Sequence, residues 1–400
     1  MRAPVFSAAV CLAAACADAP PLPSARAAAP AASGAGGALF VDVTETHVPL
    51  TAGSSMDAQA FDADGDGDLD LLIAKEMQRN VLLLNDGTGR FSDASQARLP
   101  YTLHDSEDVA VADFDGDGDP DAVVAGEDDQ VSEFYLNAGG GFFTAAGSLL
   151  PAMGTAQSVV AADVDGDGDA DLLFGNHGQN FLFINGGGRF SDQTRVRLPA
   201  AADLTQDIEV GDVDGDGDLD VVLGNVDANR ILLNDGRGFF TDATAGRLPL
   251  RASIEETREA ELADVDGDGD LDLYFANVAF VPGADPQDRL LINDGRGYFS
   301  DQTARRIGRE TAHTPEAEFV DVDRDGDLDL VTANFRDTKA YRVSLNDGTG
   351  VFREATGSVF PAGLTGEGVD VEVADFNGDG VLDIYLCSYV GTDRLILGRP

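Results

Sequence analysis

The stretch DADGDGDLD at residues 62–70 decides the fold, because the chain repeats it seven times at a nearly constant spacing. The other copies read DFDGDGDPD (113–121), DVDGDGDAD (163–171), DVDGDGDLD (212–220 and 264–272), DVDRDGDLD (321–329) and DFNGDGVLD (375–383). Their first aspartates are 51, 50, 49, 52, 57 and 54 residues apart. Such a period indicates that one structural unit of about fifty residues recurs, and that the acidic loop belongs to it.

The loop has the composition of a calcium site. Carboxylates at positions 1, 3 and 5, the backbone carbonyl of position 7 and a carboxylate at position 9 supply the six or seven oxygens that Ca²⁺ accepts, whereas Mg²⁺ demands a stricter octahedron. Gly65 and Gly67 allow the backbone to fold around the ion. In the first copy the predicted ligands are therefore Asp62, Asp64, Asp66, the carbonyl of Asp68, and Asp70.

The same positions give the predicted ligands of the other copies, for about seven ions in all. They are Asp113, Asp115, Asp117, Asp119 and Asp121; Asp163, Asp165, Asp167, Asp169 and Asp171; Asp212, Asp214, Asp216, Asp218 and Asp220; Asp264, Asp266, Asp268, Asp270 and Asp272; Asp321, Asp323, Asp325, Asp327 and Asp329; and Asp375, Asn377, Asp379, Val381 and Asp383. Arg324 replaces the first glycine of the sixth loop and could crowd it. In the seventh loop Asn377 is still an oxygen ligand and Val381 is needed only for its carbonyl, so we expect binding there too.

Other readings of the loop fit less well. An EF-hand needs a glutamate at position 12 between two helices, but position 12 of the first copy is Ile73, in an apolar stretch. Calcium-wire repeats of the thrombospondin type are rich in cysteine, and this chain has three. Solvated acidic turns without an ion remain the alternative.

Residues 57–95 show what one unit contains. A short alternating stretch leads into the loop, an apolar strand (71–74) follows it, and a second strand (81–85) leads to an Asn-Asp-Gly turn and a closing strand (90–95). Asparagine and glycine favour the positive φ angles of such a turn. Four short strands with tight connections are typical of a propeller blade.

The two ends of the repeat region predict a closed ring. The seventh unit has the strands IYLC (384–387) and RLIL (394–397) but no closing strand, and LFVDVT (39–44) matches the missing piece. A strand borrowed from the other end of the chain would remove the open edges of the array. The sequence therefore predicts an all-β fold: a seven-bladed β-propeller of four-stranded antiparallel blades at residues 38–398, closed by the N-terminal strand.

These motifs resemble the FG-GAP/VCBS repeats, whose seven-bladed propellers include the head of the integrin α subunit. The run of FVDVT, DGDLDLYFAN and NRILLNDGRGFFTDAT is most similar to bacterial secreted members. The resemblance implies that the calcium loop joins the first and second strands of each blade on the lower face, and that partners bind on the opposite face.

Charge and the N-terminus bear on location. The formal charge of −46 argues against nucleic acid and anionic membranes as partners. Residues 1–16 resemble an export signal ending in a lipobox, LAAAC, so we expect Cys16 to be lipidated; a plain cleaved signal is the alternative. Residues 17–37 are rich in Ala, Pro and Gly and should form a disordered tether. We expect an exported monomer, either an outer-membrane or cell-surface lipoprotein or a secreted protein, with membrane contact only through the lipid.

A second set of acids precedes the loops on the predicted innermost strand. A period of two places them around the upper mouth of the central channel, where they could hold a cation or receive a basic group; the alternative is pairing with arginines such as Arg258 and Arg306. The first tier is Asp57, Asp108, Ser158, Asp207, Glu259, Glu316 and Asp370, and the second is Glu209, Glu261, Glu318 and Glu372.

The long connections 276–289 and 333–342 are candidate partner surfaces, although ordinary loop variation is the alternative. We expect them to expose Phe280, Val281, Phe335 and Tyr341, residue types common at interfaces. The histidines belong to different units, so a shared site is not expected, and all four are assigned to loops on the same face: His47, His104, His177 and His313. Cys387 reads as a small buried residue.

No nucleophile motif, histidine cluster or cofactor fingerprint is present, and the chain has no Trp. The sequence therefore favours a non-catalytic, calcium-binding scaffold for protein or glycan binding and adhesion. A secreted carbohydrate-active enzyme that uses channel carboxylates, and a purely structural envelope protein, remain alternatives.

Overall fold

The computed structural model describes residues 38–49, 53–128, 130–251, 253–309, 311–337 and 339–400. The predicted export signal, the predicted lipidation at Cys16 and the predicted tether all lie outside these residues.

The first repeat forms one antiparallel sheet whose strands follow each other in chain order: β2 (Ser55–Phe61), β3 (Asp70–Lys75), β4 (Val81–Asn85) and β5 (Phe91–Asp93). Every residue of β3 is buried, because this strand lies inside the blade and the neighbouring blades cover both of its faces. Its apolar run 71–74 therefore lacks the alternation of a half-exposed strand.

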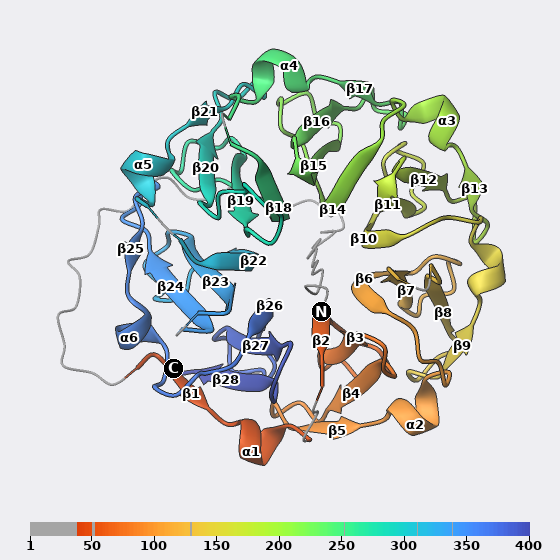
Figure 1. Ribbon diagram of the computed structural model, residues 1–400. Coiled ribbons are helices and arrows are strands. Elements are labelled where there is room, and N and C mark those ends of the chain that lie inside the picture. The colour runs from red at the N-terminus through yellow and green to blue at the C-terminus, as the bar shows by residue number, and fades with distance from the viewer. Residues whose placement is uncertain (1–37, 50–52, 129, 252, 310, 338) are drawn as a thin grey trace.

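The described residues form seven such blades around a central axis, with the first strand of each blade innermost (Figure 1). The fold predicted from the sequence is thus confirmed. The further blades are β6 (Ser106–Ala112), β7 (Asp121–Gly126), β8 (Glu133–Asn137) and β9 (Phe143–Ala145); β10 (Ala156–Ala162), β11 (Asp171–Gly178), β12 (Phe181–Ile184) and β13 (Ser191–Asp192); β14 (Asp203–Gly211), β15 (Asp220–Asp227), β16 (Arg230–Leu233) and β17 (Thr241–Asp242); β18 (Glu255–Ala263), β19 (Asp272–Asn277), β20 (Arg289–Ile292) and β21 (Ser300–Asp301); β22 (His313–Val320), β23 (Asp329–Phe335), β24 (Tyr341–Leu345) and β25 (Arg353–Glu354); and β26 (Gly368–Ala374), β27 (Asp383–Ser388), β28 (Arg394–Gly398) and β1 (Phe40–Asp42).

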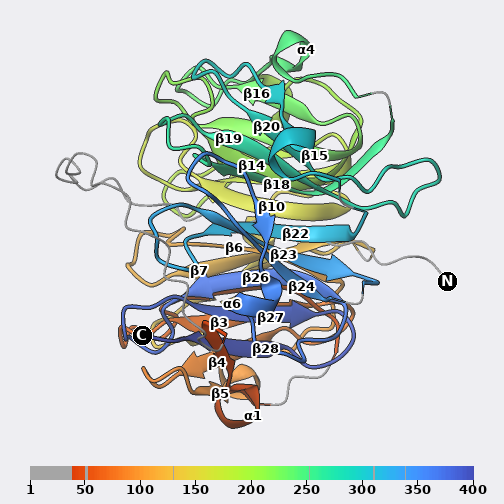
Figure 2. The same cartoon turned by 90° about the vertical axis from the view of Figure 1, so that its left-hand side faces the viewer.

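The ring closes as the split repeat predicted. Strand β1 pairs antiparallel with β28, with Phe40 opposite Gly398 and Asp42 opposite Ile396. Phe40 is buried and packs edge-on against Phe360 of the preceding blade, with ring centroids 5.7 Å apart. The first and last described segments thus complete one blade (Figure 1). The short helix α1 (Thr44–His47), which follows β1, lies near β28 (Figure 2).

Short helical turns on the outer rim were not predicted. Where the sequence suggested a six-residue closing strand, β5 has three residues and α2 (Ser95–Arg98) follows. The cause is local: Asp93 accepts hydrogen bonds from the backbone N–H and the hydroxyl of Ser95, which ends the strand and starts the turn. The related turns are α1 (Thr44–His47), the 3₁₀ turn η1 (Gly147–Leu149), α3 (Thr194–Arg197), α4 (Thr244–Arg247), α5 (Thr303–Arg306) and α6 (Thr356–Val359).

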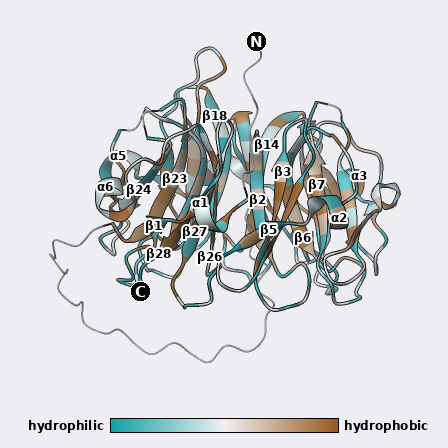
Figure 3. Ribbon diagram, turned by 90° about the horizontal axis from the view of Figure 1, so that it is seen from below, coloured by the Kyte–Doolittle hydropathy of each residue, from teal (hydrophilic) through white to brown (hydrophobic). Residues whose placement is uncertain are grey.

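The hydrophobic core lies between the blades, where the strands are most apolar (Figure 3). The phenylalanine that opens a closing strand often packs on the acidic loop of the preceding blade. Phe91 lies edge-on to Phe376 at 5.5 Å, and Phe190 lies edge-on to Phe114 at 5.7 Å. The acidic loops are therefore part of the contacts that join one blade to the next.

Candidate calcium loops and central channel

All seven acidic loops lie on one face of the ring. Each joins the first and second strands of a blade, as between β2 and β3. Because successive strands are antiparallel, the turns between third and fourth strands reach the same face, which we call the lower face, and the loops between second and third strands reach the opposite, upper face. This agrees with the arrangement that the resemblance implied.

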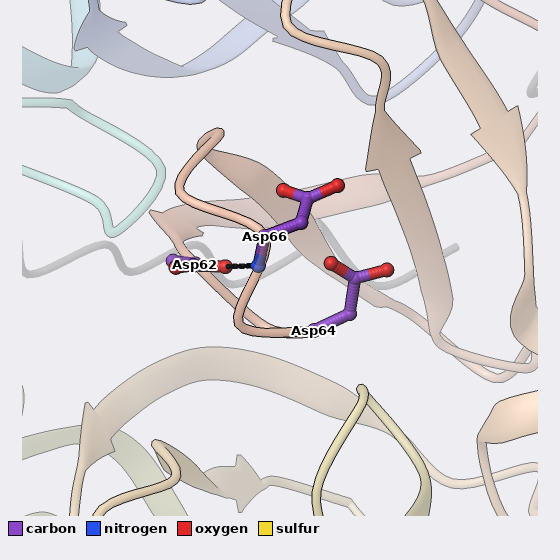
Figure 4. A group of neighbouring side chains, drawn as sticks. All are labelled: Asp62, Asp64 and Asp66. Carbon is purple, nitrogen blue, oxygen red and sulfur yellow. Dashed lines mark hydrogen bonds between the residues drawn. The ribbon is translucent and has the colours of Figure 1, made fainter.

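Backbone N–H groups hold the first aspartate of each loop in place. In the first loop Asp62 Oδ1 accepts from Gly65 N at 2.8 Å and Asp66 N at 3.2 Å, and Oδ2 accepts from Gly67 N at 3.0 Å. Both glycines have positive φ, 77° and 94°, which allows this tight wrap. The side chains of Asp64 and Asp66 project from the same side of the loop (Figure 4). Oxygens of Asp62, Asp64 and Asp66 lie within 4.8 Å of one another.

The ninth residue anchors the loop from inside the blade. Asp70 accepts from Asn85 N at 2.8 Å and from Ala63 N at 3.0 Å. Burial raises the pKa of its carboxyl to about 7, against these hydrogen bonds. Burial has the same effect, also to about 7, on Asp121, Asp171, Asp220, Asp272, Asp329 and Asp383. In the second, third and fourth loops this residue lies within 4.8 Å of the first and third aspartates, measured between their oxygens.

One buried oxygen in these loops has the character of a metal ligand. In five loops Oδ1 of the third-position aspartate is buried and accepts no hydrogen bond from the described residues; the five are Asp64, Asp165, Asp214, Asp266 and Asp323. A buried carboxylate oxygen without a partner is costly. Its recurrence at one position, among clustered carboxylates, fits a hard cation.

The sixth and seventh acidic loops depart from the repeated motif in different ways. Arg324 adopts a positive φ of 63°, as the glycine it replaces would, and its side chain donates to the carbonyl of Arg399 at 2.8 Å. It therefore points out of the sixth loop instead of crowding it, and the expectation of crowding is wrong. In the seventh loop Asn377 donates to Asp383 at 3.1 Å and accepts from Asp379 N at 3.0 Å, so its oxygen is already engaged.

An arginine clamp, missed from the sequence, connects four loops to the next blade. Arg98 of α2 donates to Asp64 at 3.0 Å in its own blade and to the carbonyl of Gly140 at 2.6 Å in the following one. Its guanidinium also lies 5.0 Å from the ring centroid of Phe142. The equivalent pairs are Arg197–Asp165, Arg247–Asp214 and Arg306–Asp266. The recurring Arg-Leu-Pro at 98–100, 197–199 and 247–249 was the available signal.

The asparagine of each turn makes a second connection of the same kind. Asn137 Nδ2 donates to Ala63 O, in the acidic loop of the preceding blade, at 2.8 Å. The corresponding bonds are Asn85 to Phe376, Asn185 to Phe114, Asn234 to Val164, Asn293 to Val213 and Asn346 to Val265. A cation that fixes the loop would therefore also stiffen the contact between blades.

The first-tier channel acids tie neighbouring innermost strands together. Asp57 accepts from Val109 N at 2.8 Å, Asp108 from Val159 N at 2.7 Å and Asp207 from Ala260 N at 2.9 Å. The arginines named as alternative partners bind elsewhere: Arg258 pairs with Glu256 at 2.9 Å, and Arg306 with Asp266. The alternative that the first-tier acids pair with Arg258 or Arg306 is therefore wrong.

The predicted aromatic surface is largely buried. Phe335 and Tyr341 are only 1% and 3% exposed, and Phe280 is half-buried against His313, with stacked rings 5.0 Å apart. The expectation that these residues are exposed is therefore wrong for Phe335 and Tyr341, because each packs into the neighbouring blades. Val281 is half-buried.

The histidines do not converge. His47 lies in α1 on the outer rim, contrary to its assignment to the upper-face loops, and is within 2.7 Å of the Thr46 hydroxyl. His177 contacts Gln206, and His104 forms a β-bridge with Gln78. Cys387 is buried, as expected.

The upper face carries a different exposed apolar patch, which was not predicted from the sequence. Met77, Tyr101 and Leu103 are 53%, 74% and 55% exposed. The bridge between Gln78 and His104 brings their two segments together, and Arg79 lies over the Tyr101 ring at 5.3 Å. We call Met77, Tyr101 and Leu103 the upper patch.

Comparison with known proteins defines the family. Segments 62–124, 113–174, 163–223, 212–275, 264–332 and 321–386 match the FG-GAP-like repeat. The chain belongs to this family. None of the curated protein sequences is similar enough to count as a relative.

Two solved structures, those of BBS1N and YCF48, agree on the fold. BBS1N, determined in complex with ARL6DN, has a TM-score of 0.56 at 11% identity, over 91% of this chain and 98% of that one. YCF48 bound to a D1 peptide has a TM-score of 0.55 at 10% identity, over 90% and 96%. A lectin of Agrocybe aegerita is 19% identical over 86% and 87%, with a TM-score of 0.47. Among the described residues, no helix has the length and apolar character needed to span a membrane.

Proposed function

We propose that this protein is a non-catalytic binding scaffold whose propeller is held together by Ca²⁺ in its acidic loops. The observation that carries the calcium assignment is the buried, unpartnered Oδ1 that recurs at the third position of five loops. Position 5 would add a second carboxylate on the same side of the loop, and the carbonyl of position 7 would complete the oxygen set.

Calcium would act on stability rather than on chemistry. At about 1 mM Ca²⁺ and a Kd of about 0.1 mM, one site contributes about 1.4 kcal/mol, so that seven approach about 10 kcal/mol. This is comparable to the net stability of a whole domain. The arginine clamps and turn asparagines would pass the effect of each ion to the next blade.

The test is calorimetric titration of Ca²⁺ into chelator-treated residues 38–400, with thermal melting in parallel. We expect about seven sites and a marked rise in Tm. Few or no sites, with an unchanged Tm, would mean that the loops are solvated acidic turns and would refute the proposal.

We propose an exported location, anchored through Cys16 or secreted, because residues 1–16 resemble an export signal. The upper patch is the proposed partner site. Exposed Met, Tyr and Leu side chains that lie together favour a protein over a glycan. Glu76 is next to Met77 in the chain, and the exposed Asp128 of the β7–β8 connection donates its backbone N–H to Asp105, two residues after Leu103, at 3.1 Å. The partner should therefore carry basic residues around an apolar anchor.

The partner surface can be tested by substitution. Once a binding protein has been isolated by crosslinking to the calcium-loaded chain, we expect Tyr101→Ala to weaken its binding at least tenfold. Tyr298→Ala is the matched control, because Tyr298 is an exposed tyrosine on a lower-face turn. Equal loss with both variants, or a glycan as the ligand that binds, would overturn this assignment.

A further inference from the structure

The innermost strands carry acids unevenly around the channel. The second-tier position holds Glu209, Glu261, Glu318 and Glu372 in β14, β18, β22 and β26. At the same position the first three blades have Gln59, Ala110 and Val160, which line one small cavity together. The first strands of all seven blades surround the central axis (Figure 1), so the equivalent position recurs around the same channel in the other blades. Its carboxylates are concentrated on one side, across four consecutive blades.

Some of these carboxylates have oxygens that the fold leaves unused. Glu372 Oε1 accepts from Ala60 N at 2.7 Å, which ties β26 to β2. Its Oε2, and the Oε2 atoms of Glu259 and Glu316, are buried and accept no hydrogen bond from the described residues. These three side chains are 3%, 2% and 1% exposed. An unpartnered buried carboxylate oxygen is unfavourable unless the group is protonated or a ligand binds it.

The acids also repel one another. Burial, followed by the charges of Glu318 and Glu209, raises the pKa of Glu261 well above its usual range. Burial and Asp370 raise the pKa of Glu318 to about 8. No ion pair among the described residues supplies these glutamates with a basic partner.

Water and ions can approach from the lower face. Along β18 the chain runs from the upper face to the acidic loop, so Glu261 lies nearer the lower face than Glu259. Glu259 is buried, whereas Glu261 and Glu318 are partly exposed. The acidic loops lie on this same face, and a strongly negative chain with formal charge −46 concentrates cations there.

We propose that the central channel binds one hard divalent cation, Ca²⁺ or an ion of similar size, between Glu259 and Glu261 of β18 and Glu316 and Glu318 of β22. Carboxylate oxygens on two adjacent strands would form the first ligands, and water from the lower mouth would complete the coordination. This ion is additional to those of the acidic loops and does not depend on them.

The test compares the number of ions bound by a double variant with the number bound by the wild type. Glu261→Gln with Glu318→Gln removes the charges, and Gln59 shows that the first blade already has glutamine at this position. After equilibrium dialysis against buffered Ca²⁺, elemental analysis should find one ion fewer per chain than in the wild type. In chelator the double variant should melt higher than the wild type, because the repulsion is gone, and Ca²⁺ should narrow or reverse this difference.

Two controls separate the channel from the loops. Asp64→Ala should remove one ion from the first loop, and Glu45→Gln, at an exposed position in α1, should remove none. If Asp64→Ala loses an ion and the channel variant does not, the channel site is overturned and the loop sites stand; the reverse result refutes the loop site and keeps the channel. If the double variant does not fold, a crystal of the wild type soaked with Mn²⁺ replaces this test. An anomalous peak between β18 and β22 would support the channel site, and its absence would overturn it.

Discussion

The clamp in the first blade allows the calcium effect to be separated from ordinary structural loss. Asp64→Ala removes a charged calcium ligand and the partner of Arg98. The lost ion contributes about 1.4 kcal/mol at 1 mM Ca²⁺, and the partly exposed Arg98–Asp64 pair contributes about 0.5 kcal/mol. In chelator only the second amount remains, and relief of repulsion between Asp64 and its neighbours Asp62 and Asp66 opposes it.

The expected result is therefore a calcium-dependent difference. With about 2.1 cal/mol/K of unfolding entropy per residue, about 2 kcal/mol lowers the Tm of a ring of this length by about 3 °C. We expect this shift for Asp64→Ala in 1 mM Ca²⁺ and less than about 1 °C in chelator, measured by circular dichroism. Arg98→Met should lower Tm by about 1–2 °C in both conditions, because it loses bonds to Asp64 and Gly140 regardless of calcium.

The control is Arg195→Met, which removes an exposed arginine of α3 outside the clamp and should leave Tm unchanged. The reasoning is refuted if Asp64→Ala lowers Tm equally with and without calcium, since the aspartate would then act only through Arg98. It is also refuted if neither condition shows a shift.

Three further predictions follow from the described contacts. The ninth-position aspartates such as Asp70 have pKa values of about 7 instead of 3.8, so the calcium-free folded chain binds more protons than the unfolded chain between about pH 4 and 7. Its stability should therefore fall as pH rises through this window, which melting in chelator at pH 5 and pH 8 tests. Calcium binding at pH 6 should release these protons, so the calorimetric heat should depend on the buffer. Phe40→Ala should lower the free energy of unfolding by about 3–5 kcal/mol, because Phe40 is a buried side chain of the closing strand. Val41→Ala, on the exposed side of the same strand, should lower it by less than about 0.5 kcal/mol in chemical denaturation. Similar losses for both variants would mean that β1 does not close the ring. Gly238→Ala should destabilise more than Gly168→Ala, although both have positive φ, because only at Gly238 would a new Cβ lie 2.7 Å from Arg197 Nη1; equal destabilisation would show that the close approach of the blades is not limiting.

Several site features could be read from single loops. The aspartates of residues 62–70 are close in sequence, so their convergence needs only the local turn that Gly65 and Gly67 permit. The clamp could not be derived in this way. Arg98 meets Asp64 and Gly140, which are 34 and 42 residues away in opposite directions, and only the packing of two blades brings them together.

Exposure was the least predictable property. Phe335 and Tyr341 lie in a connection that the sequence assigns to the surface, yet neighbouring blades cover them. Tyr101 and Leu103 lie in an inconspicuous connection and are exposed, because the bridge from Gln78 to His104 holds their segment at the edge of the upper face. Burial depends on what lies above a residue, and adjacent sequence does not record this.

The sequence by itself determined the number and order of the blades, the closure by residues 39–44 and the positions of the candidate calcium ligands. It could do so because a repeat with a fixed period must form the same unit each time, and because each nine-residue loop contains its own ligands. Only the tertiary structure decided how the loops hold neighbouring blades, which aromatic residues are exposed and which channel oxygens are left without partners. These depend on contacts between different repeats, whose geometry is set by the closed ring as a whole.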